Sequence, residues 1–321
     1  MNQLYIVMYH YTRDLLHSRY PRIKALDVRL FEQQLGFFEK NFQVVTMERV
    51  MEAVYGQRKL PERALLLTFD DGYIDNYMVA MPLLQKYHMQ GSFFVSGKTI
   101  AENELLDVNK IHFILASADI HLILDDLLVR MNGYRGKEFD FPENGELFEK
   151  YGVSTRFDDR ETIFVKRMLQ TVVPEPLRNQ ISRELFQKYL GLPEDVFARE
   201  LYMNREQIRV MKSAGMFIGV HGYEHYWLAD LPKEKMEVDI EKGLDVLEEF
   251  IDPESWVMNY PYGSYCEEVC SYARSRGAKL GLTTRVRIAN LGLESSMELP
   301  RLDCNDFPPK SENYLLLPGR E

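Results

Sequence analysis

The sequence predicts an α/β protein in which short strands alternate with helices around a parallel sheet or barrel. Apolar runs at 65–69, 91–95 and 216–220 are typical of buried strands, and apolar residues at helical spacing lie between them. The alternation stops between 102 and 209, where the pattern is charged and mostly helical and no strong strand run occurs. We therefore predict a sheet or barrel with a long helical insertion.

The predicted elements fall into two groups that flank this insertion. The first group consists, in order, of strand 4–8, helix 31–42, strand 43–46, helix 47–55, strand 65–69, helix 76–88 and strand 91–95. The second consists of strand 216–220, helix 233–250, strand 256–260, helix 266–276, strand 280–284 and strand 298–303. We predict a barrel formed by 1–101 and 210–321, with 102–209 as a lid or substrate-selecting subdomain.

Composition and charge limit the kind of protein. The chain has 321 residues and a formal charge of -10, and this acidic balance argues against a nucleic-acid-binding surface. Its three cysteines provide no even disulfide framework and are typical of a reducing compartment. The apolar run at 4–8 is too short for a signal peptide or a membrane span. We expect a cytoplasmic protein without a membrane span or nucleic-acid partner, with peripheral membrane association as an alternative; the sequence indicates no oligomeric state.

The most informative stretch is the pair of carboxylates at Asp70 and Asp71, which directly follows the strand at 65–69. Burying two adjacent carboxylates is costly unless positive charge meets them. The alternative is a solvated Asp-Asp-Gly turn. Far downstream, His221 and His225 are four residues apart and follow another apolar run. One carboxylate and two imidazoles form the three-ligand set of a catalytic metal site, with one position open for water.

Other candidate residues carry weaker signals. His10 follows the first strand and is either a functional or a packed histidine. We interpret the basic residues between Arg13 and Lys24 as a solvated loop, with contact to an anionic substrate as the alternative. His112 and His121 lie in the insertion, where we favour a structural role for a lone histidine on a helix.

Three motifs together resemble the polysaccharide deacetylase family (carbohydrate esterase family 4-like). They are Thr-Phe-Asp-Asp-Gly at 68–72, the His-x-x-x-His pair at 221–225 and Tyr-Pro-Tyr-Gly at 260–263, in this order. The resemblance covers residues 1–100 and about 200–310 and leaves out the insertion. It implies a distorted, incomplete (β/α) barrel and a metal-dependent esterase that removes N- or O-acetyl groups from sugars.

The resemblance also implies a role for each matching residue. Asp71, His221 and His225 would bind a divalent metal, with zinc preferred and cobalt, nickel or manganese as alternatives. Asp70 would be the general base, and the turn at Tyr262 would donate a backbone N–H to the oxyanion. The residues that we expect to contact the substrate are Tyr73, His10, Tyr223 and Pro261.

The sequence departs from the family pattern in three places. Gly222 stands where the family has Ser or Thr, whose hydroxyl steadies the loop, and Asn259 stands where it often has an arginine that orients the base. We predict that Arg301, from another strand end, replaces that arginine. No histidine follows His225, so the motif that supplies the general acid in many members is missing. The candidates for the acid are His10, His112 and Asp303.

We therefore predict a cytoplasmic, metal-dependent hydrolase that removes an N-acetyl (or O-acetyl) group from a carbohydrate. The expected substrate is an intracellular glycan precursor, an acetylated amino sugar linked to a nucleotide, a lipid or an oligosaccharide. The alternatives are an amidohydrolase that acts on a small non-sugar amide and a carbohydrate-binding relative that has lost turnover.

Overall fold

The computed structural model describes residues 3–56, 58–156 and 158–317. Contacts within the chain divide it into two compact units, which we call the sheet unit and the helical unit. The sheet unit comprises Met1–Asp14, Ala25–Glu104 and Ala198–Glu321. The helical unit comprises Leu15–Lys24 and Leu105–Phe197.

The sheet unit is built on one nine-stranded sheet. Its strands are β1 (Gln3–Tyr9), β4 (Gln43–Val44), β5 (Ala64–Phe69), β6 (Gly91–Val95), β7 (Phe217–Val220), β8 (Trp256–Asn259), β9 (Ala278–Leu282), β10 (Ala289–Asn290) and β11 (Leu302–Asp303). Their order is β10-β1-β5-β6-β7-β8-β9, with β11 paired to β1 and β4 to β5. Neighbours from β1 to β9 are parallel, and β10 runs antiparallel to β1. The sheet is curled, and the predicted distorted, incomplete (β/α) barrel is confirmed. A separate small sheet pairs β2 (Thr12–Arg13) with β3 (Leu26–Asp27).

One stretch of chain, residues 299–303, closes the curl, and we call it the closing segment. Leu299 donates its N–H to Gly281 O of β9 at 2.8 Å. Three residues further on, Leu302 of β11 pairs with Val7 of β1. The closing segment therefore joins β9 to β1. The strand predicted at this place pairs as a strand only over β11.

Apolar side chains cover both faces of the sheet. All six residues of β5 are buried, and alternate residues belong to different layers. Leu66 and Phe94 lie in the cluster inside the curl, whereas Leu67 and Phe93 lie in the larger cluster beneath the helices. Because both faces are covered, these strands are continuous apolar runs and not alternating ones.

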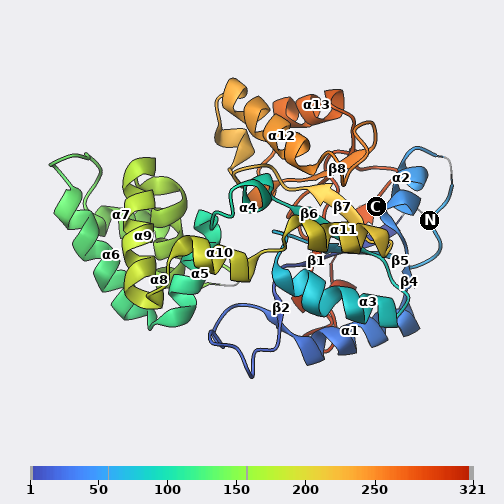
Figure 1. Cartoon of the computed structure of the whole chain (residues 1–321), viewed down its shortest axis with the longest axis horizontal. Helices are drawn as coiled ribbons and strands as arrows, with labels where there is room; N and C mark the ends of the chain where they lie inside the picture. Colours follow the sequence, from blue (N-terminus) through green and yellow to red (C-terminus); the bar gives the residue numbers. More distant parts are fainter. Residues whose placement is uncertain (1–2, 57, 157, 318–321) are drawn as a thin grey trace. The chain divides into compact units, whose positions relative to one another are not determined.

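The helices of the sheet unit pack outside the curl, with one exception. They are α1 (Val28–Asn41), α2 (Met47–Val54), α3 (Met81–Lys86), α4 (Gly97–Ala101), α11 (Arg205–Ser213), α12 (Lys233–Leu247) and α13 (Glu267–Ser275). The exception is α2, whose Met47 and Val50 belong to the cluster inside the curl. Figure 1 shows α1 and α3 on one side of the strands and α12 and α13 on the other. The predicted helix at 76–88 is divided, because a π-helical turn at Asn76–Ala80 precedes α3 and Pro82 lies in the first turn of α3.

The helical unit, drawn mainly in green in Figure 1, is a group of packed helices. They are α5 (Asp107–Ser117), α6 (Ile120–Tyr134), α7 (Asn144–Tyr151), α8 (Arg160–Arg167), a π-helical turn (Met168–Val172) and α9 (Glu175–Leu190), while α10 (Glu194–Leu201) passes from this unit into the sheet unit. Arg22 donates to Ala116 O at 3.2 Å and Lys24 contacts Asp158 at 2.6 Å, so these two cations of the basic stretch have a packing role. The domain limits 1–101, 102–209 and 210–321 stay a prediction, and their outer ends lie outside the described residues.

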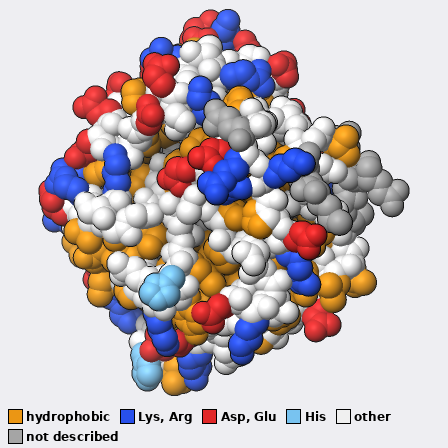
Figure 2. Space-filling view, turned by 90° about the vertical axis from the view of Figure 1, so that its right-hand side faces the viewer, with side chains coloured by type: hydrophobic (Ala, Val, Ile, Leu, Met, Phe, Trp, Pro, Cys, Tyr) orange, Lys and Arg blue, Asp and Glu red, His pale blue; other side chains and the backbone are white. Residues whose placement is uncertain are grey.

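The length of the described helices and the distribution of charge on one face are two further features of the molecule. No helix in the described part of the chain is long and apolar enough to cross a bilayer. Figure 2 shows acidic and basic side chains interspersed over the visible face.

We expect Phe38→Ala in α1 to lower the free energy of unfolding by about 3–5 kcal/mol, because the ring is buried and its loss leaves a cavity. The ring packs edge-on against Phe42 and Phe307, with centroids 5.8 and 5.2 Å away. Urea unfolding followed by circular dichroism measures the change. Glu39→Ala, at the exposed neighbour, is the control and should change the free energy by less than about 0.5 kcal/mol. Equal effects of the two substitutions would contradict the packing described.

Candidate metal centre and hydrolytic site

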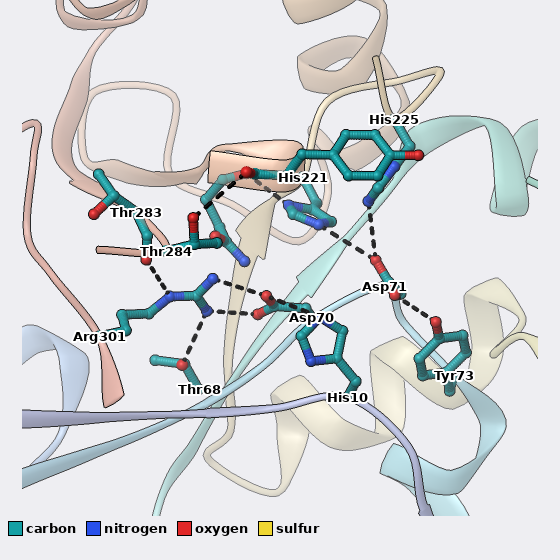
Figure 3. Close-up of polar contacts among 12 residues, drawn as sticks. His10, Thr68, Asp70, Asp71, Tyr73, His221, His225, Thr283, Thr284 and Arg301 are labelled. Atoms are coloured by element: carbon teal, nitrogen blue, oxygen red, sulfur yellow. Dashed lines mark hydrogen bonds and ion pairs between the residues drawn. The ribbon is translucent and has the colours of Figure 1, made fainter. Parts of the chain in front are cut away.

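The candidate site lies at one end of the curled sheet. His10 follows β1, Asp70 and Asp71 follow β5, and His221 follows β7. Because these strands are parallel, their carboxyl ends share one edge, and the side chains that follow them meet there (Figure 3). Arg301 reaches the same place from the closing segment.

Asp71, His221 and His225 form a cluster that could hold a metal ion. The Nε2 atoms of both imidazoles lie 3.3 Å from Oδ1 of Asp71, and all three side chains are buried. Among the described residues, this oxygen has no hydrogen-bond donor, although a buried carboxylate oxygen requires a partner. A divalent cation is such a partner, and one carboxylate with two imidazoles is a donor set typical of zinc. The residues present therefore fit a metal.

Neighbouring groups fix the orientation of the three side chains. Nδ1 of His221 lies 2.6 Å from the carbonyl oxygen of Asn259, so this nitrogen is the donor and Nε2 is left for a ligand. The hydroxyl of Tyr73 donates to Oδ2 of Asp71. Asp71 and His225 have φ angles of 71° and 59°, which are uncommon outside glycine. Such backbone conformations persist where the surrounding structure imposes them, often at functional sites.

The charge states of Asp71 and His225 suit metal binding. By contrast, the pKa of His221 is raised, because its contact with Asp71 and the charge of Asp70 outweigh burial, which alone would lower it. Burial alone would raise the pKa of Asp71, but the imidazoles of His221 and His225 outweigh burial and hold this pKa well below its usual value. Burial lowers the pKa of His225. At neutral pH the carboxylate of Asp71 is therefore ionised and the imidazole of His225 is neutral, which are the forms that bind metals.

A second carboxylate lies beside the cluster and is held by Arg301. The guanidinium donates to the two oxygens of Asp70 at 2.7 and 2.8 Å, in a bidentate pair. It also donates to Thr283 O at 2.9 Å and to Thr68 Oγ1 at 3.2 Å. Burial alone would raise the pKa of Asp70, but the charge of Arg301 outweighs burial and, with help from His10, lowers this pKa. Arg301 thus contacts Asp70, the candidate base. Its role in orienting that base stays a prediction.

Of the three candidates for the general acid, His10 lies at the site. Its Nε2 is 3.7 Å from Oδ2 of Asp70, and its side chain is 40% exposed. His112 lies in α5 of the helical unit. Asp303 accepts hydrogen bonds from the backbone and side-chain amides of Asn305 at 2.8 and 2.6 Å, and it caps a short 3-10 turn. These contacts give Asp303 a structural role and offer no support for its prediction as a catalytic acid.

The turn predicted to face the oxyanion spans Pro261–Gly263. It is closed by a hydrogen bond from its last N–H to Tyr260 O at 2.8 Å, and Tyr262 within it has a φ of 58°. The ring of Tyr262 stacks on Trp227 at 4.4 Å and meets His225 edge-on at 4.6 Å. The turn and an aromatic pair therefore lie beside one of the candidate metal ligands.

Two of the residues predicted to contact the substrate are buried. Tyr73 is fully buried, stacks on Tyr11 with 4.0 Å between ring centroids, and donates to Asp71. Tyr223 is also buried, and its hydroxyl donates to Glu102. Tyr73 thus contacts a candidate metal ligand and Tyr223 packs behind the site, while their roles as substrate contacts stay predictions.

Among the buried acids that sequence reasoning missed, Asp239 contacts the loop that carries His221 and His225. Asp239 lies on α12, and its two oxygens accept the backbone N–H groups of Tyr223 and Glu224 at 2.9 and 2.8 Å. Its neighbours on the helix face, Met236 and Ile240, are buried. A carboxylate within the apolar stripe of an amphipathic helix is the signal that could have revealed it.

Comparison with known protein families identifies the family of the chain. A family model described as polysaccharide deacetylase matches residues 57–132 and 186–281, which is more than half of the chain. The chain therefore belongs to the polysaccharide deacetylase family. The family consists of hydrolases that act on carbon–nitrogen bonds, and it is generally metal-dependent.

Individual relatives match shorter parts of the chain. YxkH of Bacillus subtilis (strain 168) is 33% identical over 105 residues, which are 32% of this chain and 36% of that protein. The poly-β-1,6-N-acetyl-D-glucosamine N-deacetylase of Escherichia coli (strain K12) is 32% identical over 87 residues, which are 27% of this chain and 13% of that protein. The chain thus matches little more than a third of the first relative and a smaller part of the second.

Two solved structures resemble nearly the whole chain. The Streptococcus pyogenes deacetylase PplD, in complex with acetate, has a TM-score of 0.59 and 19% identity, over 98% of this chain and 96% of that one. IcaB from Ammonifex degensii has a TM-score of 0.58 and 19% identity over the same shares. At this level of identity the likeness concerns the fold.

We expect Arg301→Met to lower the free energy of unfolding by about 3–5 kcal/mol, because it leaves Asp70 buried without its cation. In an Asp70→Asn background the same substitution should lower the free energy of unfolding by clearly less, since no charge is then left unpaired. Urea unfolding of the four proteins measures the coupling. Arg276→Met, which breaks an exposed pair with Glu241, is the control and should cost less than about 1 kcal/mol. Equal losses for Arg301→Met in both backgrounds would argue against the coupling.

Proposed function

We propose that this protein is a divalent-metal-dependent hydrolase that removes N-acetyl groups from an amino sugar. The observation that carries the proposal is the buried cluster of Asp71, His221 and His225. Beside it lies the carboxylate of Asp70, held by Arg301. Amide hydrolysis needs a base for the attacking water, stabilisation of an oxyanion and an acid for the leaving amine. The chain offers a candidate group for each task at the carboxyl ends of its strands.

The metal would be held by Asp71, His221 and His225. Zinc is the ion that this donor set favours, with cobalt, nickel and manganese as alternatives. A bound divalent ion supplies Lewis acidity, which makes water more acidic and polarises an amide carbonyl. The contacts of His221 with Asn259 O and of Asp71 with Tyr73 would keep these ligands oriented.

The remaining tasks fall to two side chains and one backbone amide. Asp70, kept ionised by Arg301, accepts a proton from the attacking water. The backbone N–H of Tyr262 donates to the oxyanion that forms as water adds to the carbonyl. His10 gives a proton to the amine nitrogen as the C–N bond breaks, so that the products are acetate and a free amine.

An acetylated amino sugar is the substrate that the surroundings of the cluster favour. The stacked, half-buried rings of Trp227 and Tyr262 offer the kind of apolar face on which a sugar ring packs. The relative from E. coli is named for N-deacetylation of poly-β-1,6-N-acetyl-D-glucosamine, and PplD was solved with acetate, the product expected here. Nucleotide-, lipid- and oligosaccharide-linked amino sugars are the candidate forms. The cytoplasmic location and the intracellular precursor stay predictions.

We expect the purified protein to hold about one divalent ion per chain, and His225→Ala to lose most of it because one of three ligands is gone. Mass spectrometry of protein purified without added metal measures the content. His121→Ala, whose side chain is 70% exposed in the helical unit, is the control and should keep the metal. Protein that stays metal-free after incubation with zinc would favour the carbohydrate-binding alternative.

We expect the protein to release acetate from at least one of a nucleotide-linked, a lipid-linked and an oligosaccharide-linked N-acetyl amino sugar. Asp70→Asn should keep the metal and lower kcat by about 10²–10⁴-fold, because an amide cannot take up the proton. Asp245→Asn, at an exposed position of α12, is the control and should leave kcat unchanged. Turnover of a small cyclic amide, with every acetylated sugar inert, would favour the amidohydrolase alternative. Near-normal kcat in Asp70→Asn would refute its role as base.

A further inference from the structure

The loop at 221–225, which we call the metal loop, carries two of the candidate ligands and is held by its backbone. Its carbonyls from His221 to Tyr223 accept hydrogen bonds from Ser96 Oγ, Gly97 N and Lys98 N at 3.1, 3.0 and 3.2 Å. The three donors lie at the start of α4. One neighbouring element therefore fixes three consecutive carbonyls of the metal loop.

The amides of the metal loop are held from another side by a single carboxylate. Oδ2 and Oδ1 of Asp239 accept the N–H groups of Tyr223 and Glu224 at 2.9 and 2.8 Å, and Asp239 is only 3% exposed. A buried carboxylate is costly, and consecutive backbone N–H groups form a concave site that stabilises an anion. Because both oxygens are occupied by the loop, Asp239 acts on the loop and not on a substrate.

Gly222 allows this carboxylate to reach the metal loop. Its φ is +67°, and a Cβ at this position would lie 2.8 Å from Oδ2 of Asp239. One helical turn along α12, a Cβ on Gly243 would lie 3.1 Å from Gly222 O. The helix therefore approaches so closely that a side chain at 222 meets the carboxylate. Gly222 stands where the family pattern has Ser or Thr, and its lack of a side chain leaves room for the carboxylate of Asp239.

We propose that Asp239 is a positioning residue for the metal loop and takes the place of the hydroxyl that is missing at Gly222. In the family pattern that hydroxyl steadies the loop from within, whereas here a carboxylate steadies it from α12. With two of its amides fixed, the loop keeps His221 and His225 at equal distances from Oδ1 of Asp71. The inference rests on the metal site of the proposed function.

The test compares Asp239→Asn with Ile240→Val, at the next residue of α12, in the full chain. In Asp239→Asn, an N–H donor replaces one of the two oxygens that accept hydrogen bonds from the loop. Ile240→Val removes one methyl group from the buried core beneath the same helix. Competition with a chromophoric chelator measures the zinc Kd of each metal-free protein. We expect a Kd about 10–100-fold higher for Asp239→Asn and an unchanged Kd for Ile240→Val.

Thermal unfolding of the metal-free proteins separates positioning from general stability. Both variants should lower Tm, so a rise in Kd that is common to both would assign the effect to stability and overturn the proposal. A wild-type Kd in Asp239→Asn would overturn it as well. A raised Kd in Asp239→Asn alone, at a Tm similar to that of Ile240→Val, would support it.

Gly222→Ala tests the same contact from the loop and keeps the proposal testable if Asp239→Asn fails to fold. The added methyl should displace the carboxylate and raise the zinc Kd. In the combined variant the two effects should be less than additive, because either change alone already breaks the contact. A wild-type Kd in Gly222→Ala, or strict additivity, would contradict the proposed link.

The outcome in the wild-type protein separates this inference from the proposed function. Wild-type protein that binds no zinc would overturn the metal site, and the role of Asp239 with it. Zinc binding in the wild type that Asp239→Asn and Gly222→Ala leave unchanged would overturn the role of Asp239 alone.

Discussion

The buried pair of Asp70 and Arg301 joins the chemistry of the site to the closure of the sheet. Asp70 follows β5, and Arg301 belongs to the closing segment between β9 and β1. The same guanidinium bonds Thr283 O, just beyond β9, and Thr68 Oγ1 on β5. It therefore spans the seam of the curl, and its positive charge is what makes an ionised carboxylate tolerable in the interior. This one contact therefore links the closure of the sheet to the ionised state of the candidate base.

Local patterns were enough to predict the central part of the site. Runs of apolar residues predicted β5 and β7, and the residues that follow such strands in a parallel fold meet at one edge. That reasoning brought four side chains to one edge, those of Asp70, Asp71, His221 and His225. The family resemblance then indicated Asp71 as the ligand, and the structure places the Nε2 atoms of both histidines 3.3 Å from Oδ1 of Asp71. Arg301 was predicted from the family resemblance, as the replacement for the family arginine that this chain lacks, and it contacts Asp70 from another strand end.

Side chains whose direction depends on tertiary packing could not be predicted in this way. Tyr73 follows a glycine turn and has the composition of a sugar contact, yet stacking on Tyr11 directs its ring into the core. Asp239 looks like an ordinary helix residue until α12 is docked on the metal loop. The stretch Leu15–Lys24 looks like a loop of the barrel, but it packs with the helical unit through contacts more than 90 residues away in the sequence.

The distance in sequence between Asp70 and Arg301 determines when the site can be completed. The two residues are 231 positions apart, so the carboxylate emerges from the ribosome long before its cation. While translation continues, β1, β5 and β6 can already pair and the first helices can pack. The seam beside β1 stays open, however, until the closing segment is made. The arrangement of the candidate base therefore waits for the closing segment, and a nascent chain that has not reached residue 301 lacks it.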